Sequence, residues 1–446
     1  MKSNSRRMAL EMLGEVRRGQ RSSAVLDYFL EREHVSLQDR SFITELVYGV
    51  LRWQGKLDQT IERYSSKKAH QISPWVLDAL RLGVYQLLFL KGITVYAAIY
   101  ETVHLVKSGP EYYARGFVNG ILRTIDRQRE LIRRWYDRPK DSVEGLAFDE
   151  SYPDALVHRW VDLFGFESAQ KICRAENEMP PLTLRVNTLK INRQEFMRVL
   201  SEKRIPASPT LYSPVGIRLL KNIRVRELPY YEEGYFQIQD EASQLVGYAV
   251  SPQPGAAVLD VCAAPGGKTT HLAELTQDRS EILALDYNPS RVEKIKKNCE
   301  RLGIQSVRVE TQDFLKGFLS KKFDTILVDA PCSGWGILRR RPEAKWTRNL
   351  IDLSTFSHQQ RSFLKKAQGC LKPGGVLVYS VCTFSKEETE EVISAFLEEN
   401  PHFRVDSLQG CLPKACEPFL TSEGFLKIVP GDHAMDGFWM ARLLSK

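Results

Sequence analysis

Two cysteines follow predicted strands in the second half of the chain. Cys332 lies in the segment DAPCSG, shortly after the apolar run Thr325–Val328, and Cys382 directly follows the apolar run Val376–Val381. Parallel strands present their carboxyl ends at one edge of a sheet, so we expect the two thiols to face one ligand. Disulfide exchange is one use of such a pair, although redox dithiols usually form a local Cys-x-x-Cys.

Methylation of a pyrimidine ring carbon is the other use. Carbon 5 of cytosine is not nucleophilic enough to attack a sulfonium methyl group directly. Addition of a thiolate at carbon 6 turns the ring into an enamine that can attack, and a base then removes the carbon-5 proton so that the thiol leaves. This is covalent catalysis, in which one difficult step is divided into easier ones.

A reactive thiolate needs a depressed pKa, which a helix N-terminus can supply. The tetrapeptide SKEE (385–388) is typical of a capping box and predicts a helix that starts near Ser385. The positive end of that helix would lie close to Cys382 and favour the thiolate.

A ligand-binding turn is predicted within Val258–Glu274, VLDVCAAPGGKTTHLAE, between a buried strand and a helix beginning near Thr269 or Thr270. A phosphate-binding P-loop would need glycine where Cys262 stands, and the Gly-x-Gly-x-x-Gly dinucleotide fingerprint is absent. Asp286 ends the next predicted strand, EILALD, where an acid can hold ribose hydroxyls. A ribose-binding acid without a phosphate cradle fits S-adenosylmethionine (SAM). For Cys262 we expect a small buried residue whose backbone faces the cofactor.

Four motifs carry a family resemblance. CAAPGGKT, DAPCSGWG, the SVCT cysteine and the terminal DGFWMARL resemble the Fmu/Sun family of RNA cytosine-5 methyltransferases. The resemblance implies Cys382 as the nucleophile, Cys332 as the cysteine that assists proton removal and release, and Asp329 beside the methionine and the target base. It also implies Asp286 on the ribose and Asp313 near the adenine. The SAM-binding residues that it implies are Cys262, Ala263, Ala264, Pro265, Gly266, Gly267, Lys268, Asp286, Arg291, Asp313 and Asp329.

A basic loop follows Cys332. Arg339–Arg341, with Trp335 and Trp346, combines positive charge with aromatic rings, which suits phosphate contact and stacking on unpaired bases. A solvated run of charges is the alternative interpretation. We expect this loop to be open to RNA.

Residues 236–446 alternate predicted strands and helices, which indicates a Rossmann-like domain with a parallel sheet and right-handed crossovers. A helix over 356–371 is followed by a KPGG turn and the strand VLVYSV, and GFLKIVP and DGFWMARLL predict a terminal hairpin. Asp286, Asp313, Asp329 and Cys382 all fall at the carboxyl ends of predicted strands. We therefore expect them around one crevice.

Residues 1–145 are predicted to be helical throughout. DRSFITELVYGVLRW follows helical spacing with Asp39 as a candidate N-cap, and ARGFVNGILRTIDRQRELIRRW fits a further helix. DRSFITELVYGVLR and FVNGILR resemble the NusB-like RNA-binding domain, so an all-α NusB-like bundle is expected. Residues 146–235 predict a small α/β module that binds RNA or links the domains, with short strands in PPLTLRVNTLK, around Leu211 and at Gly216–Leu220.

The net charge of +8 is unevenly distributed along the 446 residues. Residues 1–140 hold 24 Lys and Arg against 15 Asp and Glu, a balance of +9, and residues 141–446 hold 39 against 40, a balance of −1. This excess suggests that the N-terminal part meets a polyanion, and a solvated helical surface is the alternative.

The length of 446 residues predicts about three domains, and a hydrophobic content of 43% is enough to form their cores. The sequence has no run of 18 apolar residues and no signal-peptide core, and its eight cysteines lack the paired close spacing of zinc sites. We expect a cytoplasmic monomer that needs no membrane and no metal.

These patterns together predict a SAM-dependent RNA cytosine-5 methyltransferase. Along nearly its whole length the chain resembles the bacterial member of the family that acts on small-subunit (16S) ribosomal RNA. Two alternatives stay open: the same chemistry on transfer RNA, and a non-catalytic RNA-binding assembly or antitermination factor.

Overall fold

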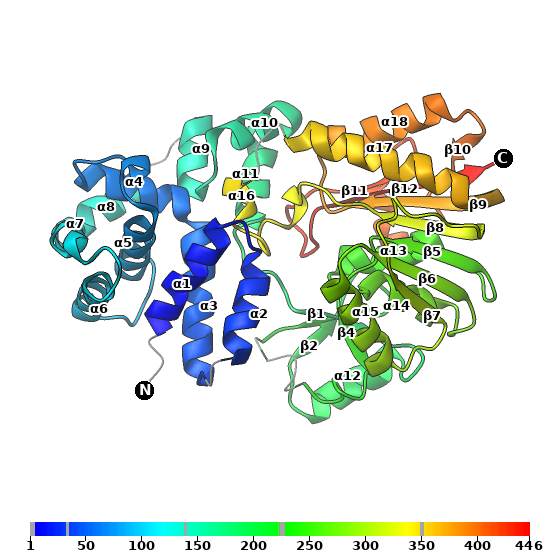
Figure 1. Cartoon of the computed structure of the whole chain (residues 1–446), viewed down its shortest axis with the longest axis horizontal. Helices are drawn as coiled ribbons and strands as arrows, with labels where there is room; N and C mark the ends of the chain where they lie inside the picture. The colour runs from blue at the N-terminus through cyan, green and yellow to red at the C-terminus, as the bar shows by residue number, and fades with distance from the viewer. Residues whose placement is uncertain (1–4, 33–34, 138–140, 222, 224–227, 348–351) are drawn as a thin grey trace. The chain divides into compact units, whose positions relative to one another are not determined.

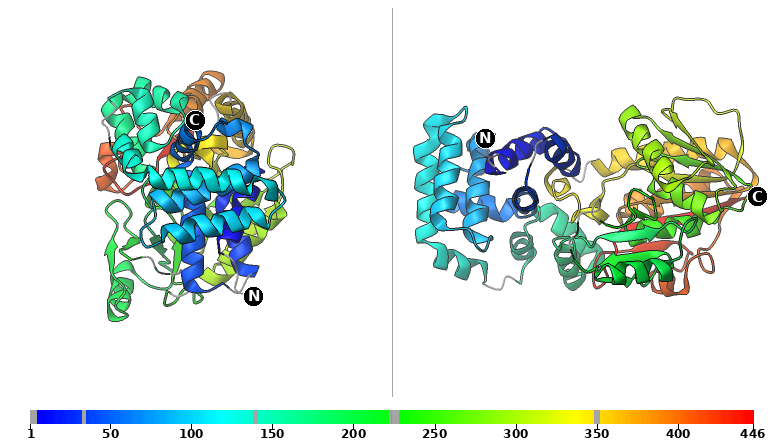
Figure 2. Two further views of the ribbon diagram at one scale, coloured as in Figure 1. Left: turned by 90° about the vertical axis from the view of Figure 1, so that its left-hand side faces the viewer. Right: turned by 90° about the horizontal axis from the view of Figure 1, so that it is seen from below.

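The computed structural model describes residues 5–32, 35–137, 141–221, 223, 228–347 and 352–446. The chain forms two compact units, Met1–Glu178 with Leu338–Arg348, and Met179–Ile337 with Asn349–Lys446. Figures 1 and 2 show the elements of both units, coloured along the chain. The domain limits predicted at 145 and 235 stay a prediction, whereas the first compact unit extends to Glu178 and takes in the later segment Leu338–Arg348.

The first unit is a helical bundle, as predicted. Its helices are α1 (Ser5–Arg17), α2 (Ser22–Arg32), α3 (Leu37–Arg52), α4 (Gln54–Tyr64), α5 (Pro74–Leu88), α6 (Val95–Lys107), α7 (Arg115–Arg127), α8 (Arg129–Tyr136), α9 (Val143–Glu150), α10 (Asp154–Phe164), α11 (Phe166–Ala175) and α16 (Ala344–Thr347), with short 3-10 turns at Ala69–Gln71 and Tyr112–Ala114. Every residue of α5 from Val76 to Leu87 is buried, and α1, α3, α4, α6 and α7 all contact it. A helix that is buried all round forms the centre of a bundle.

Two local predictions in this bundle are wrong. The N-cap of α3 is Ser36, whose hydroxyl accepts a hydrogen bond from the Asp39 backbone N–H at 3.1 Å, so Asp39 lies inside the first turn. The segment expected as one helix over 114–135 contains two helices, because α7 ends at Arg127 and α8 starts at Arg129 after a non-helical Gln128.

The core of the second unit is a sheet covered by helices on both faces. Its strands are β5 (Ala257–Val261), β6 (Glu281–Asp286), β7 (Val307–Thr311), β8 (Phe323–Asp329), β9 (Leu371–Val381), β10 (Phe403–Val405), β11 (Leu426–Ile428) and β12 (Phe438–Ser445). Its helices are α13 (Glu241–Val250), α14 (Gly267–Leu275), α15 (Pro289–Leu302), α17 (Asp352–Cys370) and α18 (Glu390–Glu399), with 3-10 turns at Trp335–Ile337, Lys386–Glu388 and Lys414–Phe419. The strand order is β10-β12-β9-β8-β5-β6-β7.

The pairing within this sheet is mixed. β9, β8, β5, β6 and β7 are parallel, whereas β12 runs antiparallel to β9 and to β10 and β11. The predicted terminal hairpin is confirmed by the pairing of Leu426 with Met440. Side chains of β5 alternate between the two faces: Val258 packs in a core with α13, α14 and α15, and Leu259 packs in a core with α17 and α18. This gives the three layers that Figure 1 shows.

We predicted that the KPGG segment would form a turn between a helix and a strand, but the structure shows no such turn at these described residues. β9 begins at Leu371 and includes these four residues. Phe323 of β8 pairs with Leu371, yet Thr325 pairs with Val376, so the extra residues of β9 form a bulge. The Gly-rich segment is therefore absorbed in an irregular strand.

A small antiparallel sheet precedes the large one in the second unit. Its strands are β1 (Thr183–Val186), β2 (Ala207–Pro209), β3 (Gly216–Leu219) and β4 (Phe236–Ile238), in the order β2-β3-β1-β4, with α12 (Arg193–Glu202) packed against them. Phe196 and Leu200 of α12 share a core with Leu184 of β1. The strand expected around Leu211 is wrong, because β2 ends at Pro209 and Leu211 is exposed.

The predicted succession of an all-α bundle, a small α/β module and a Rossmann-like sheet is thus confirmed. In the part of the chain that is described, no helix has the length and apolar character needed to cross a membrane.

Candidate active site

The residues predicted at strand ends do lie along one edge of the large sheet. Cys382 follows β9, Asp329 ends β8, Cys262 follows β5, Asp286 ends β6, and Asp313 comes just after β7. These strands are consecutive neighbours and all parallel, so their carboxyl ends form one continuous edge. Such an edge is where ligands bind in open α/β sheets.

The turn after β5 passes through two residues with left-handed backbone, Cys262 at φ 62° and Gly266 at φ 96°. Glycine tolerates this conformation, and Gly266 serves as the N-cap of α14. The chain can therefore enter the helix directly at Gly267, earlier than the predicted start at Thr269 or Thr270. The first N–H groups of α14 are thus brought next to the strand end.

Side chains of α15 hold this turn from outside. Arg291 donates a hydrogen bond to the carbonyl of Ala264 at 2.9 Å, and Asn298 donates to the carbonyl of Pro265 at 2.8 Å. Burial raises the pKa of the Cys262 thiol well above its usual range, so the sulfur stays protonated. This supports the expectation that the backbone of Cys262, and not its sulfur, serves a ligand.

Asp286 is a buried acid with an unused acceptor. Its Oδ1 accepts a hydrogen bond from the Asn288 backbone N–H at 3.0 Å. Its Oδ2 lies 3.4 Å from Nη1 of Arg291 but accepts no hydrogen bond from any residue that the structure describes. A buried carboxylate oxygen without a hydrogen bond is costly, so this atom suits a ligand that brings a hydroxyl donor.

Asp313 is more open. Its side chain is 40% exposed, its Oδ1 accepts from the Leu315 backbone N–H at 3.0 Å, and Lys316 lies 3.4 Å from its Oδ2. These contacts order the loop after β7 and leave the side chain accessible at the far end of the same edge.

Asp329 and Lys268 connect the turn to the thiol side of the edge. The Lys268 ammonium lies 2.6 Å from Oδ2 of Asp329, and the Ser380 hydroxyl donates to Oδ1 at 2.8 Å. The ammonium also lies 5.2 Å from the centre of the Phe438 ring in the terminal DGFW motif. Charge-assisted contacts of this kind fix the orientation of the carboxylate.

The two predicted thiols meet at this edge. Sγ of Cys332 and Sγ of Cys382 lie 3.2 Å apart, and both residues are half-buried. This distance is well beyond the roughly 2.05 Å of a disulfide bond, so the pair is present as thiols in hydrogen-bond contact. The contact with Cys382, followed by burial, raises the pKa of Cys332 well above its usual range. Without substrate, Cys332 can therefore donate a hydrogen bond towards Cys382.

The capping box predicted over 385–388 does not form. The 3-10 turn Lys386–Glu388 precedes α18, and Ser385 makes no side-chain cap there. The Glu388 carboxylate instead accepts hydrogen bonds from the Ser333 backbone N–H at 2.8 Å and hydroxyl at 2.6 Å, and from Gln360 at 3.1 Å. Ser333 is buried, so its N–H needs an acceptor and takes the carboxylate that a capping box would use.

Glu388 thereby becomes part of the site, a role that was not predicted from the sequence. It fixes the backbone directly after Cys332 and is buried itself. Burial raises the pKa of its carboxyl, and its charge contributes to the raised pKa of Cys332. An acid that follows a strand-end cysteine by a few residues is a weak signal, because a solvated helix start has the same pattern.

Arg185 is a second residue whose role was not predicted. It lies in β1, is fully buried and makes a two-pronged ion pair with Glu274 of α14, at 2.6 and 2.9 Å. It also donates to the Thr270 hydroxyl at 2.9 Å and to the Gly267 carbonyl. An arginine within the alternating strand TLRV was the available signal, and its contacts show how the small sheet holds the first turn of α14.

The basic loop after Cys332 is less exposed than we predicted, because Arg340, Arg341 and Trp346 are only half-exposed. Trp335 and Arg339 are buried, and residues 338–347 pack with the helices of the first unit. The backbone N–H of Arg339 donates to Glu176 at 2.7 Å, and Nε1 of Trp346 donates to the Leu51 carbonyl at 2.9 Å. Burial of the apolar parts of these side chains stabilises the folded state relative to their exposure to water.

Lys345 in this segment is buried without a carboxylate at hydrogen-bond distance among the described residues. Its ammonium donates to Asn177 Oδ1 at 2.6 Å and to the carbonyls of Arg52 and Ser151 at 3.3 Å, and it lies 3.6 Å from the centre of the Tyr152 ring. Burial lowers the pKa of Lys345 to about 7. The lysine thus anchors the segment through neutral acceptors.

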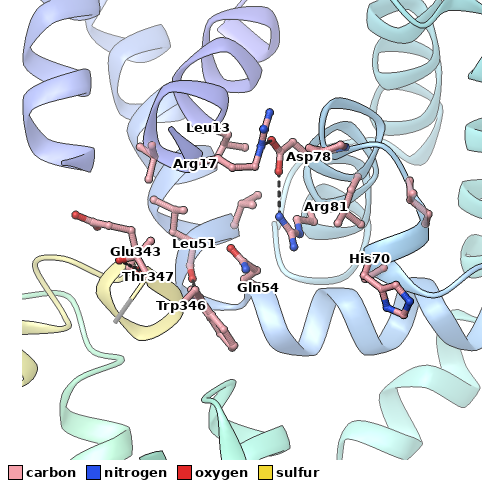
Figure 3. A pocket seen from close by; sticks show the side chains of 16 residues that line it. Leu13, Arg17, Leu51, Gln54, His70, Asp78, Arg81, Glu343, Trp346 and Thr347 are labelled. Carbon is pink, nitrogen blue, oxygen red and sulfur yellow. Dashed lines mark hydrogen bonds and ion pairs between the residues drawn. The ribbon is translucent and has the colours of Figure 1, made fainter. Parts of the chain in front are cut away.

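The first unit also contains a cavity of about 370 Å³, one wall of which is formed by Glu343 and Trp346. Figure 3 shows Asp78 between Arg17 and Arg81 at this cavity. Arg17 lies 3.1 Å and Arg81 lies 3.0 Å from the Asp78 carboxylate. Because these charged groups form ion pairs with one another, we interpret them as a structural network and not as a ligand site.

The chain matches three family models. Residues 247–444 match 16S rRNA methyltransferase RsmB/F, residues 3–127 match the NusB family, and residues 152–226 match the RsmF/B-like ferredoxin-like domain. The match over residues 247–444 includes the edge described above. The match over residues 3–127 agrees with the resemblance noted for the helical bundle.

Relatives of full length show the same similarity. A Bacillus subtilis protein named probable ribosomal RNA small subunit methyltransferase B is 38% identical over 450 residues, covering 100% of this chain and 99% of its own. The ribosomal RNA small subunit methyltransferase B of Pseudomonas syringae is 33% identical and covers 93% of this chain and 91% of its own.

Solved structures agree with this similarity. PH0851 is 26% identical with a TM-score of 0.84 and covers 99% of both chains. A methyltransferase homolog from Pyrococcus horikoshii is 31% identical with a TM-score of 0.61 and covers 69% of this chain and 100% of its own. On the strength of this identity along the whole chain, the protein belongs to the 16S rRNA methyltransferase RsmB/F family and is an enzyme of that methyltransferase family.

Proposed function

We propose that the protein transfers a methyl group from SAM to carbon 5 of a cytosine in small-subunit (16S) ribosomal RNA. The observation that carries this proposal is the pair of thiols, 3.2 Å apart, on the same sheet edge as the buried Asp286 oxygen that accepts no hydrogen bond from the described residues. Covalent activation of a pyrimidine needs a nucleophile beside a base, and a bound SAM needs a ribose-binding acid. Candidate residues for both requirements lie on the carboxyl edge of the large sheet.

The residues along the edge suit SAM. The unused Oδ2 of buried Asp286 would accept from a ribose hydroxyl, and Arg291 would hold the turn and the acid in position. Cys262 to Lys268 would line the methionine end with backbone groups, and Asp313 would lie near the adenine. When bound, SAM supplies an electrophilic methyl group on a sulfonium. A relative from Pyrococcus horikoshii, NSun6, 25% identical with a TM-score of 0.60, was solved with SFG.

Cys382 is assigned as the nucleophile. Its Sγ adds to carbon 6 of cytosine, and the electrons of the carbon 5–carbon 6 double bond become available at carbon 5. Because the two sulfurs lie 3.2 Å apart, Cys332 can donate a hydrogen bond to the attacking sulfur of Cys382.

Cys332 is assigned to release. Once carbon 5 carries the methyl group, Cys332 would first lose its own proton to solvent, and its thiolate would then take the carbon-5 proton. The electron pair then restores the double bond, and the bond between Cys382 Sγ and carbon 6 breaks. The hydrogen bonds of Glu388 to Ser333 would hold Cys332 in position for this step.

Asp329 is assigned to the target base. Its carboxylate is oriented by Lys268 and Ser380, which leaves it able to stabilise charge that develops on the ring. The lysine would thereby link the cofactor turn to the base-binding side.

The choice of substrate rests on the relatives and on the front part of the chain. The names of the full-length relatives favour ribosomal over transfer RNA, and the basic balance of residues 1–140 suits a polyanion. We assign residues 1–145 to a NusB-like RNA-binding domain, 146–235 to a small module that binds RNA or links, and 236–446 to catalysis. We further propose that the protein acts in the cytoplasm as a monomer. A non-catalytic assembly factor would not need both thiols on the edge.

The two cysteines provide the decisive experiment. Cys382→Ala should give neither methylated RNA nor a covalent complex when the protein is incubated with SAM and small-subunit ribosomal RNA. Cys332→Ala should still attack and methylate but fail to release, so a denaturing gel should show a slow protein–RNA band that depends on SAM. The double variant should lose that band, because the bond is to Cys382.

Other outcomes would contradict the assignments. A trapped band with Cys382→Ala instead of Cys332→Ala would reverse the two roles. Methylation by both single variants without any band would mean that the covalent mechanism is wrong. Bisulfite sequencing of RNA treated with the wild-type protein tests the carbon-5 assignment and identifies the nucleotide.

A further inference from the structure

An open groove of about 640 Å³ lies between α6 and α7 in the first unit. The two helices contact one another and are drawn in cyan tones in Figure 1. Tyr96 and Tyr100 of α6 form one side of the groove, and Asn119, Arg123 and Arg127 of α7 form the other. None of the residues that line the groove belongs to a strand, and none is assigned to catalysis.

The α6 side carries a ladder of parallel aromatic rings. Tyr96 and Tyr100 stack with ring centres 5.3 Å apart at an angle of 12°, and Tyr100 and His104 stack at 6.1 Å and 6°. The two tyrosines are 72% and 51% exposed, so their rings are accessible to a ligand. Spacing of four residues places the three rings in one row along the helix.

Positive charge lies on the opposite side. Arg123 and Arg127 are exposed, and they donate hydrogen bonds to neutral groups of their own helix, Asn119 Oδ1 at 3.1 Å and the Thr124 hydroxyl at 3.2 Å. Within the described residues neither arginine has a carboxylate in ion-pair range. Asp126 is the acid at the groove, and Arg129 already pairs with it at 2.8 Å. The guanidinium groups are thus available to an anionic ligand.

The helix surface between these sides is shallow. Gly120 lines the groove, and a Cβ added there would meet nothing within 4 Å. Gly116, one turn earlier on α7, has the same open space. A flat ligand can therefore approach the helix backbone beside the tyrosines.

We propose that this groove binds a single-stranded segment of RNA, with bases stacked on the Tyr96–Tyr100–His104 ladder and phosphates at Arg123 and Arg127. Every base has an aromatic face, so stacking platforms beside basic side chains bind single strands with little dependence on sequence. A duplex keeps its bases stacked inside and would offer only phosphates. The inference rests on the proposed RNA substrate and names where the front part of the chain would hold it.

The binding experiment uses the full chain and a fluorescein-labelled 12-nucleotide single-stranded RNA of mixed sequence, followed by fluorescence anisotropy. The double variant Tyr96→Ala/Tyr100→Ala should weaken binding by about 5- to 150-fold for each base that no longer stacks on a ring. Tyr96→Phe/Tyr100→Phe keeps both ring faces and should bind close to wild type. Tyr28→Ala is the matched control, because Tyr28 is a similarly exposed tyrosine on α2, outside the groove.

The salt dependence of RNA binding tests the arginines on the α7 side of the groove. Arg123→Gln/Arg127→Gln should lower the slope of log affinity against log salt by about 0.7 for each phosphate that is no longer neutralised. Gly120→Leu should fill the floor and weaken binding at least tenfold, whereas Gly120→Ala adds one methyl group in open space and should bind nearly as wild type. Calorimetry with S-adenosylhomocysteine should give the same affinity for all these variants, which shows that the second unit is intact, and unchanged thermal unfolding of the first unit excludes a loss of its fold.

The proposal is overturned if Tyr96→Ala/Tyr100→Ala binds the RNA as tightly as Tyr28→Ala. In that case the groove would have to serve another ligand, such as a protein surface. This result would leave the proposed function intact if the wild type still methylates ribosomal RNA. Absence of methylation by a wild-type protein that does bind RNA in the groove would instead contradict the proposed function alone.

Discussion

The carboxyl edge of the large sheet and the groove between α6 and α7 both gather polar and soft side chains, but with opposite exposure. At the edge, Asp286 is buried, Asp329 is oriented by two partners, and Cys332 and Cys382 touch each other. In the groove, the tyrosines and arginines are exposed and contact mainly their own helix.

This difference follows from the work that each region is proposed to do. Chemistry at a ring carbon needs groups that are fixed and partly desolvated, because orientation and pKa must be set before the substrate arrives. Affinity for a flexible polyanion needs exposed rings and charges that adapt to it. Buried fixed groups should therefore respond strongly to mutation, and exposed groups should affect affinity with little effect on stability.

The largest effect on stability is expected at Arg185. Replacing it by methionine leaves the buried Glu274 carboxylate without its partner, which should lower the free energy of unfolding of the second unit by about 3–5 kcal/mol. Urea unfolding of the full chain, followed in the second unit by hydrogen exchange of the large sheet, measures this.

Arg308→Met is the matched control for that experiment. Arg308 pairs with Glu310 at 2.6 Å in the same unit, but its side chain is 78% exposed, so the change should be below about 1 kcal/mol. Equal destabilisation of the two variants would show that the buried pair has no special role in stability.

The buried lysine of the first unit should give a pH dependence. Burial lowers the pKa of Lys345 to about 7, whereas an unfolded lysine titrates near about 10.4. Between these values the unfolded state binds one proton more, so stability of the first unit should rise with pH from about 7 to about 10. Hydrogen exchange at about pH 7, 8 and 9 would give the free energy of unfolding of the first unit in wild type and in Lys345→Met. This free energy should rise less steeply with pH in the variant, and the two slopes should differ by on the order of 1 kcal/mol per pH unit.

The expected rise would be absent if Lys345 kept its charge through its contacts with Tyr152 and Asn177. Wild type and Lys345→Met would then have parallel profiles. Comparison with an exposed lysine, Lys107→Met on α6, controls for the general effect of removing a positive charge.

A smaller effect is expected at the cofactor turn. Asp286→Ala should weaken SAM binding by about 1–3 kcal/mol, because ribose hydroxyls would lack their acceptor, while the fold is kept. Calorimetry with SAM measures this, and Asp313→Ala, at the exposed end of the same edge, should have a smaller effect. An unchanged affinity in Asp286→Ala would refute the assignment of this acid to the ribose.

The smallest effect separates two candidate caps in the first unit. Ser36→Ala removes the hydroxyl that accepts from the Asp39 N–H and should cost about 1 kcal/mol of stability. If Asp39 were the cap, as its sequence pattern suggested, Ser36→Ala would be silent. Thermal unfolding of Ser36→Ala distinguishes the two, whereas Asp39→Ala would not, because the Asp39 carboxylate accepts hydrogen bonds from the Ser5 and Ser36 hydroxyls at 2.6 Å.

Local sequence patterns were enough to predict the order of elements and the candidate edge. Alternating apolar runs and turn residues specify strands and helices locally, and parallel strands bring their ends to one side, so Asp286, Asp329 and Cys382 could be predicted on one edge. The N-terminal helices were predictable for the same reason, because their apolar residues recur with helical period.

The partners of the polar side chains, in contrast, depend on the tertiary structure. SKEE has the local pattern of a capping box, yet the buried N–H of Ser333 takes the Glu388 carboxylate. The Arg-rich segment after Cys332 has the pattern of an open basic loop, yet it packs with helices of the first unit. Arg185 finds Glu274 across 89 residues of sequence. Each outcome depends on groups distant in the chain, because a buried donor or charge must be paired by whatever residue the fold brings to it, and no local pattern records which residue that is.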